Sequence, residues 1–334
     1  MLAVTTASIP VSWWVLFNAF VIFMLALDLG VFNRKAHVVK VKEALGWTAV
    51  WIALAMCFNV WIGWKLGAPA AKEFLAGYIL EKSLSVDNVF VFAVIFSFFK
   101  VPREYQHKVL FWGIFGALAL RAGMIAGGAA LLNHFSWVIY VFAALLVYTG
   151  IKMFFHDEDS VDPGRSIAVR LLRRTMPMTD GYRGGRFLIV EDGKRMATPL
   201  LAVLLCVEVT DVIFAVDSIP AIFAITTDTF IVYTSNVFAI LGLRALYFAI
   251  AGILPYFHFL KYGLGTILIF VGVKMSLAHS EWKIDTNVSL GIIGGVLAIS
   301  TIASVIHRKL HPLPESPLEE VLEETPDEVL EEKK

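Results

Sequence analysis

The stretch EVTDVIFAVDSIPA, residues 208 to 221, places three carboxylates in a segment that is otherwise as apolar as the middle of a membrane helix. The three are Glu208, Asp211 and Asp217. The chain around them has 334 residues, of which 58% are hydrophobic and 17% charged, and its mean hydropathy is +0.74. Soluble domains are only about 45–50% apolar and about 25% charged, so this composition predicts an integral membrane protein. Charges inside its apolar segments therefore need a physical reason.

Other features of the composition exclude several classes of protein. The formal net charge is zero, so there is no basic field to attract nucleic acid. Cys57 and Cys206 both lie in apolar segments and form no CxxC pair, which argues against a disulfide framework or a thiolate metal site. The sequence has no nucleophile motif, phosphate loop or metal-hydrolase spacing, so we expect neither an enzyme nor a tightly bound cofactor.

The apolar segments predict nine transmembrane helices, since a span needs roughly 20 mostly apolar residues. The predicted spans cover residues 11–32, 46–65, 73–99, 108–132, 136–154, 197–224, 230–254, 258–278 and 287–306. Lys and Arg concentrate in the loops after the first, third and fifth spans, which the positive-inside rule places in the cytoplasm. We therefore expect the N-terminus outside and the C-terminus in the cytoplasm.

The spans divide the chain into six regions. We expect two N-terminal spans with a basic loop (1–72), a three-helix unit (73–154), a cytoplasmic loop (155–196), a second three-helix unit (197–278), a ninth span (279–306) and an acidic tail (307–334). In the cytoplasmic loop, SIAVRLLRRTM is typical of a short amphipathic basic helix, and RFLIVEDGKRMAT predicts a hairpin that turns at Asp192 and Gly193.

The two three-helix units form an internal repeat. EKSLSVDNVF from Glu81 aligns with DVIFAVDSIP from Asp211, which also pairs Asp87 with Asp217. Further along, GALALRA matches AILGLRA and YTGIKM matches FVGVKM, in the same order. Each copy contains an odd number of spans, so the copies must lie in opposite orientations across the membrane. Inverted repeats are typical of transporters, whose substrate site lies near the midplane between the copies.

The buried acids predict a bound cation. An ionised carboxylate at the centre of a span costs roughly 2.5 to 3.5 kcal/mol, so acids in both copies need a compensating charge. The candidate ligands all offer oxygen and are Glu81, Asp87, Asn88, Glu208, Asp211 and Asp217, with Thr210, Ser218 and Asn236 as weaker candidates. Oxygen ligands without imidazole or thiolate suit Mg²⁺, Ca²⁺ or Mn²⁺, and the ligand chemistry leaves these three open.

Helix geometry complicates a single site. On a straight helix, the spacing of Asp211 and Asp217 turns their side chains well apart. Pro220 clashes with the backbone one turn earlier, so we expect it to open the helix just before Asp217. The first copy has no such proline after Asp87, and a break there would have to come from SVDN alone.

Two alternatives remain open at this point. The acids could pair with Arg121, Arg244 or Lys82 and simply lock helices together, and the two arginines could also act as countercharges that replace the ion. A rival function of a different class is a membrane scaffold that anchors partner proteins through the cytoplasmic loop and the acidic tail.

The motifs also carry a family resemblance. EKSLSVDNVFVF and EVTDVIFAVDSIPAIFAITTDTFIVYTSNVFAILGLRALYF resemble the signature segments of the TerC family, particularly its Alx-like bacterial branch, within a likeness that covers about residues 15–305. The resemblance implies a member of the LysE-type transporter superfamily that exports Mn(II) across the bacterial inner membrane, and it carries the acidic site over to Glu81, Asp87, Glu208, Asp211 and Asp217. Protons are the expected counter-ion, because carboxylates released by the metal can be reprotonated. The expected partners are thus Mn(II), protons and the lipid bilayer, and the sequence does not indicate an oligomeric state.

Overall fold

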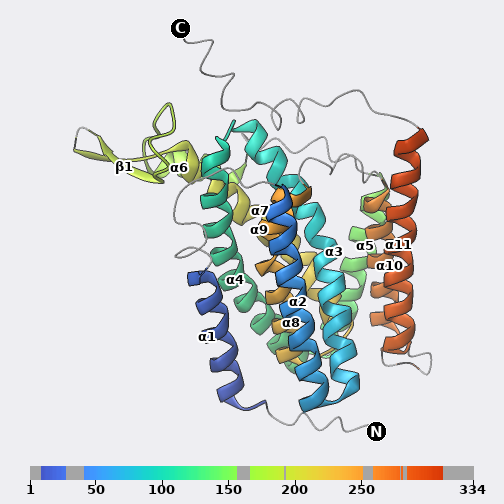
Figure 1. The fold of residues 1–334 in the computed structure, drawn as a ribbon. Helices are drawn as coiled ribbons and strands as arrows, with labels where there is room; N and C mark the ends of the chain where they lie inside the picture. Colours follow the sequence, from blue (N-terminus) through green and yellow to red (C-terminus); the bar gives the residue numbers. More distant parts are fainter. Residues whose placement is uncertain are drawn as a thin grey trace.

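The computed structural model of the protein describes residues 9–27, 41–155, 166–191, 193–250, 259–278, 280 and 284–310. Within these ranges the chain is mostly helical. Long helices run side by side as a bundle, and a short helix and a two-stranded hairpin lie together at one end of it (Figure 1). The protein is an integral, multi-pass membrane protein, as its composition predicts.

Each of the nine predicted spans lies largely on helix in its described part, whereas residues 28–32, 251–254 and 258 lie outside the described residues. The bundle consists of α1 (Val11–Leu27), α2 (Val41–Leu66), α3 (Ala68–Phe98), α4 (Arg103–His134), α5 (Val138–Phe155), α7 (Pro199–Phe223), α8 (Thr229–Leu241), α9 (Leu243–Ile250), α10 (Leu260–Ser276) and α11 (Thr286–Leu310). The seventh predicted span corresponds to α8 and α9 together, which only Gly242 separates.

Within the described part of the chain, six spans are long and apolar enough to cross a membrane when α8 and α9 are counted as one, namely α2, α4, α5, α7, α8 with α9, and α11. The helix α1 is apolar but has 17 residues, and α10 also has 17. The helix α3 has 31 residues but carries five charged side chains, which is more than a lipid-facing span tolerates. The crossing of the membrane by α1, α3 and α10 therefore stays a prediction, as does the total of nine spans.

The expected opening of α7 at Pro220 is wrong. The helix continues past Pro220 to Phe223, and the Ala224 amide donates a hydrogen bond of 3.0 Å to the Pro220 carbonyl. The residues from Ser218 to Phe223 are all buried, so packing holds the last turn in place although the proline removes one backbone hydrogen bond. The helix α3 is likewise continuous through SVDN. The acids on both helices therefore keep the directions that a regular helix gives them.

The closest packing in the bundle is between α5 and α10. A Cβ atom at Gly150 would lie 2.7 Å from the Gly265 carbonyl oxygen, and one at Gly272 would lie 2.8 Å from the Ala143 carbonyl oxygen. Such distances leave no room for a side chain, so glycine allows the two backbones to touch. Elsewhere, α3 packs on α7 and α8, and α4 packs on the same two helices.

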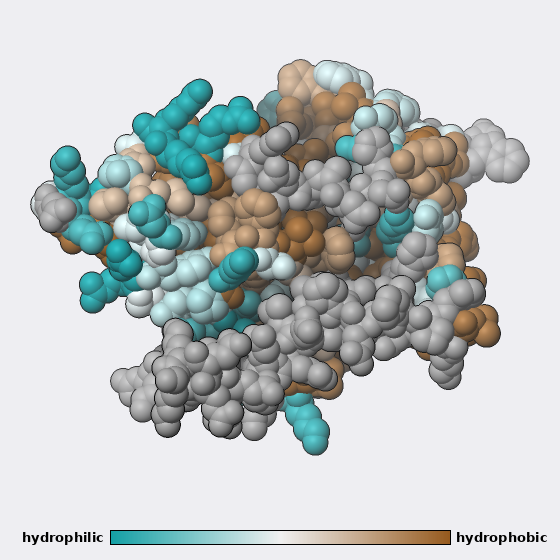
Figure 2. Space-filling view, turned by 90° about the horizontal axis from the view of Figure 1, so that it is seen from above, coloured by the Kyte–Doolittle hydropathy of each residue, from teal (hydrophilic) through white to brown (hydrophobic). Residues whose placement is uncertain are grey.

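The segment between α5 and α7 has the two elements that the sequence predicts. The helix α6 (Ile167–Thr175) is capped by the Ser166 hydroxyl, and β1 (Leu188–Glu191) pairs antiparallel with β2 (Lys194–Ala197). Asp192, at the predicted turn, lies outside the described residues, as does the acidic tail from residue 311 onward. Seen from this end of the bundle, hydrophilic side chains gather on the side where α6 and the hairpin lie (Figure 2).

Hydrogen bonds from Tyr182 and Lys108 help to attach this segment to the bundle. The Tyr182 hydroxyl donates to the Phe99 carbonyl over 2.7 Å, and the Lys108 ammonium donates to the Gly185 carbonyl over 2.7 Å. Burial raises the pKa of Tyr182 to about 12, so its hydroxyl stays protonated and remains a donor at neutral pH.

The backbone contact between α5 and α10 generates a stability prediction. Replacing Gly150 with Ala places a methyl group against the Gly265 carbonyl, and overpacking of this kind costs about 1–3 kcal/mol. We expect a lower midpoint of thermal unfolding for the Gly150→Ala protein in detergent. Gly123→Ala on α4 is the matched control, because a Cβ there meets nothing within 4 Å. Equal midpoints for the two variants would contradict the close approach.

Candidate functional site at Arg121

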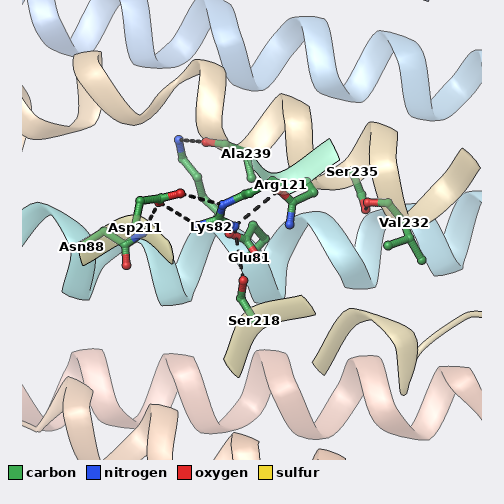
Figure 3. Close-up of polar contacts among 10 residues, drawn as sticks. Glu81, Lys82, Asn88, Arg121, Asp211, Ser218, Val232, Ser235 and Ala239 are labelled. Carbon is green, nitrogen blue, oxygen red and sulfur yellow. Dashed lines mark hydrogen bonds and ion pairs between the residues drawn. The ribbon is translucent and has the colours of Figure 1, made fainter. Parts of the chain in front are cut away.

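The centre of the bundle holds a buried arginine between two buried acids. Arg121 of α4 is 2% exposed and forms an ion pair with Glu81 of α3. On its other side, Nε lies 3.2 Å from Oδ2 of Asp211 and Nη2 lies 3.0 Å from Oδ1 of the same carboxylate on α7. Such a two-pronged contact fixes the plane of the guanidinium and is among the strongest hydrogen-bonded pairs in proteins. Figure 3 shows the two acids on either side of Arg121.

Neutral polar side chains complete the surroundings of the arginine. Its Nη1 donates to the Ser218 hydroxyl over 3.2 Å and to the Asn236 carbonyl oxygen over 3.4 Å. The Asn88 amide donates to Oδ1 of Asp211 over 3.5 Å. Side chains from α3, α4, α7 and α8 thus meet at one point, which we call the Arg121 cluster: Glu81, Asn88, Arg121, Asp211, Ser218 and Asn236.

The cluster has more negative than positive charge if both of its carboxylates are ionised. Glu81 and Asp211 are 1% and 2% exposed, and Arg121 supplies one positive charge between them. A third carboxylate, Glu208, lies one turn before Asp211 on α7, where its side chain packs against Gly116 of α4. Buried charge without compensation is costly, so this region favours uptake of either a proton or an additional cation.

Several oxygen atoms in this region have no partner among the described residues. They include Oε2 of Glu81, Oδ1 of Asn88 and Oε2 of Glu208, all buried. A buried acceptor without a hydrogen bond costs about 1–3 kcal/mol, and native proteins contain few of them. Carboxylate and amide oxygens are ligands that hard divalent cations prefer, so these atoms could hold such an ion.

The structure does not gather all six predicted ligands at one point. Among the described residues, no group of three or more His, Cys, Asp and Glu side chains is placed to hold a metal ion. Asp217 is half-buried and accepts a hydrogen bond of 2.8 Å from Thr149 of α5. The spacing of Glu81 and Asp87 on a regular helix turns their side chains about 120° apart. Glu81, Asn88 and Asp211 share the Arg121 cluster, whereas metal binding by the six residues stays a prediction.

The other basic residues considered for pairing with the acids have different contacts. The Lys82 ammonium donates to the Ala239 carbonyl near the end of α8 over 3.3 Å (Figure 3). A guanidinium nitrogen of Arg244 lies 2.8 Å from Nε2 of His107. The sequence does not show which helices face one another. It therefore could not distinguish Arg121, Arg244 and Lys82 as partners of the acids.

The segments that carry the buried acids are shared with a known protein family. Residues 66–311 match the model of the integral membrane protein TerC family, a range that includes the entire Arg121 cluster. The chain belongs to the TerC family. The expected resemblance to this family is thereby confirmed.

Relatives of this TerC-family protein cover nearly its whole length. An uncharacterized membrane protein of Myxococcus xanthus is 54% identical over 299 residues, which span 90% of this chain and 93% of the relative. The Alx protein of Salmonella typhi, described as a candidate membrane-bound redox modulator, is 46% identical over 306 residues, with 89% and 94% covered. A membrane protein of Rickettsia bellii is 40% identical over 297 residues, with 89% and 98% covered. No solved structure matches the chain.

The buried ion pairs predict a strong dependence of stability on Arg121. Arg121→Gln leaves Glu81 and Asp211 without a countercharge, and removing one partner of a buried pair costs about 3–5 kcal/mol. We expect a marked drop in the thermal unfolding midpoint of the purified protein. A triple variant, Glu81→Gln, Arg121→Gln and Asp211→Asn, should unfold at a higher temperature than Arg121→Gln because it leaves no uncompensated charge. Exposed Lys72→Gln is the control, and unchanged unfolding of Arg121→Gln would contradict the pairing.

Proposed function

We propose that this TerC-family protein exports a divalent cation, foremost Mn(II), from the cytoplasm across the bacterial inner membrane. The observation that carries the proposal is the Arg121 cluster, where acids from two distant parts of the chain meet in a buried, oxygen-rich site. The oxygen ligands favour Mg²⁺, Ca²⁺ or Mn²⁺. The family resemblance favours Mn(II) among these, and it also underlies the proposed LysE-type superfamily and inner-membrane location.

The packing of the helices supports the proposed inverted repeat. Glu81 and Asp211 are aligned in the two copies, and both contact Arg121. The repeat alignment also pairs Gly150 with Gly272 and Ala143 with Gly265. The close contact of Gly150 with Gly265 therefore corresponds to that of Gly272 with Ala143, as a two-fold relation between the copies requires. Likewise, the packing of α3 on α8 corresponds to that of α7 on α4.

The arrangement in Figure 1 supports the proposed orientation. The helix α11 ends on the side of the bundle that carries α6 and the hairpin, and α1 begins on the opposite side. The segment with α6 and the hairpin is rich in arginine, so the positive-inside rule favours a cytoplasmic location for it. This arrangement supports the proposal of a cytoplasmic C-terminus, an outside N-terminus and nine crossings.

Arg121 has a defined part in the proposed mechanism. Its guanidinium binds Glu81 and Asp211, the same carboxylates that would bind the cation. Cation and guanidinium therefore compete, and the acids always retain a countercharge while the repeats rock against each other. Proton counter-transport is part of the proposal, since carboxylates released by the cation can take up protons. Efflux that is unchanged when the pH gradient is collapsed at constant membrane potential would contradict that coupling.

The ion pairs also favour a second candidate, a membrane scaffold with structural acids. In this alternative, Arg121 joins three helices and the surface of α6 and the hairpin binds partner proteins. The name of the Alx relatives suggests a role in redox balance. Cys57 is exposed on α2 and Cys206 is buried on α7, and the structure has no disulfide between them. Cation transport separates the two candidates, because a scaffold does not require it.

The transport proposal predicts loss of Mn(II) movement when the shared carboxylates are neutralised. We expect Glu81→Gln and Asp211→Asn to lower the rate of Mn(II) efflux at least about tenfold at matched membrane expression, since a hydrogen bond or ligand to a charged group contributes about 1.5–3 kcal/mol. Radioactive Mn(II) in inverted membrane vesicles provides the measurement. Glu191→Gln in the exposed hairpin is the control.

Asp87→Asn and Asp217→Asn should be measured in the same vesicles, because the internal repeat makes these two aspartates the first choice for direct ligands from the sequence. Normal transport by all four neutralised proteins would favour the scaffold. Deleting the tail from Glu315 provides the converse test. A transporter retains efflux after this deletion, whereas a scaffold that acts through the tail loses its cellular effect.

Competition between Arg121 and the cation predicts a second measurement. Mn(II) should raise the unfolding temperature of the Arg121→Gln protein at a concentration at least about tenfold lower than for wild type, which corresponds to about 1.4 kcal/mol. Arg121→Lys should lie between the two, because an ammonium cannot make the same two-pronged contact. The Arg121→Lys protein can also replace Arg121→Gln in this measurement if Arg121→Gln yields too little protein. An equal or weaker response to Mn(II) in both variants would contradict competition.

A further inference from the structure

One face of α3 carries a line of buried polar side chains that extends beyond the Arg121 cluster. Tyr78, Glu81, Ser85 and Asn88 are 5%, 1%, 1% and 2% exposed. Each has a side-chain oxygen without a hydrogen-bond partner among the described residues: the Tyr78 hydroxyl, Oε2 of Glu81, the Ser85 hydroxyl and Oδ1 of Asn88. We call these four residues the α3 stripe. Two of them belong to the Arg121 cluster, and Tyr78 and Ser85 do not.

Helix geometry shows that the four side chains share one direction. At 100° per residue they lie within a sector of about 80°, and they extend along about 15 Å of helix, half of a hydrocarbon core of about 30 Å. Ser83 lies about 180° from the centre of this sector. The stripe is therefore a line of oxygen atoms spaced about one helical turn apart.

Ser85 differs from its neighbour Ser83 in a way that local structure does not explain. The Ser83 hydroxyl donates to the Ile79 carbonyl over 2.6 Å, the usual bond of a serine inside a helix. The Ser85 hydroxyl has no such bond in the structure, although it is more deeply buried. Its oxygen therefore remains available to another ligand.

The stripe lies where α3 meets the second repeat. A Cβ atom at Gly77, beside Tyr78, would lie 2.9 Å from the Ser235 hydroxyl of α8 and 3.7 Å from the Ile222 side chain of α7. Further along, Asn88 donates to Asp211 of α7. The hydroxyl of Ser235 is already bonded to the Val232 carbonyl of its own helix over 3.1 Å (Figure 3). Because a hydroxyl has only one hydrogen to donate, Ser235 does not donate it to an oxygen of the stripe.

Helix packing alone does not explain four buried oxygens without hydrogen-bond partners, because each one destabilises the fold by about 1–3 kcal/mol. A cation path does use them, since closely spaced oxygens replace the water shell of an ion step by step. We propose that the α3 stripe is the path by which a divalent cation reaches and leaves the Arg121 cluster, with the Ser85 hydroxyl as a ligand between Glu81 and Asn88. This inference rests on the proposed cation transport and adds its route and a further ligand.

A soft metal ion tests the position of Ser85 directly. In a background with Cys57→Ala and Cys206→Ala, Ser85→Cys introduces a thiol into the stripe and Ser83→Cys introduces one on the opposite face of α3. Thiolate ligands prefer Cd²⁺ to the hard cations. We expect Cd²⁺ to inhibit Mn(II) transport by Ser85→Cys at a concentration at least about tenfold lower than for Ser83→Cys. Excess Mn(II) should relieve the inhibition.

Two further measurements keep a negative result interpretable. Ultraviolet absorption by the Cd²⁺–thiolate bond in purified protein reports binding at Ser85→Cys without transport, so it still tests the site if the parent protein moves no Mn(II). Ser85→Ala should raise the Mn(II) concentration for half-maximal transport, whereas Ser83→Ala should not. Equal Cd²⁺ binding by both cysteine variants, or equal transport by both alanine variants, would overturn the assignment of Ser85.

Discussion

The structure depends on the requirement that charge inside a membrane bundle be compensated. Arg121 meets this requirement by binding Glu81 on one side and Asp211 on the other, all three nearly inaccessible to solvent. These contacts join α3, α4 and α7, and the bond to Asn236 adds α8. Because an unpaired charge is costly in such surroundings, the pairs limit how these helices can be arranged. In the proposed mechanism, the carboxylates of Glu81 and Asp211 serve both helix packing and cation binding.

Helical periodicity divides the polar residues of α3 between two sides of the helix. Tyr78, Glu81, Ser85 and Asn88 form the stripe, whereas Ser83 is directed away from it. On α7 the same effect places Asp211 beside Arg121 and Asp217 beside Thr149 of α5. Neither helix is interrupted, so neither can direct all of its acids at one ion. In the proposed mechanism the repeats move relative to each other, so the cation could contact Asp211 and Asp217 at different stages of the transport cycle.

The contact between α5 and α10 has a different character, because glycines bring backbone against backbone there. Gly150, Gly265 and Gly272 bring two backbones together at distances that any side chain would prevent. Such close packing is the main source of association between helices when lipid and protein are equally apolar. It suits a rigid pair on which the other helices of the two proposed repeats can move.

The sequence by itself determined the class of protein, the helical segments and the family. Apolar runs identify membrane helices because lipid offers no partner for the backbone, so each run must satisfy its own hydrogen bonds. The short helix α6 and the hairpin were also predictable, since local signals specify both. The sequence further singled out Glu81, Asn88 and Asp211, because charged and amide side chains are rare in such runs.

Only the tertiary structure decided which of these residues meet. Sequence could not choose among Arg121, Arg244 and Lys82 as partners of the acids, because that choice depends on which helices are neighbours. It expected an open helix at Pro220, where burial of the last turn keeps α7 intact. It also missed Ser85 and Tyr78, which are unremarkable in a sequence and become candidates only when burial leaves their oxygens without a partner. The composition of a segment is a local property, whereas the compensation of its charges requires contacts between helices far apart in the chain.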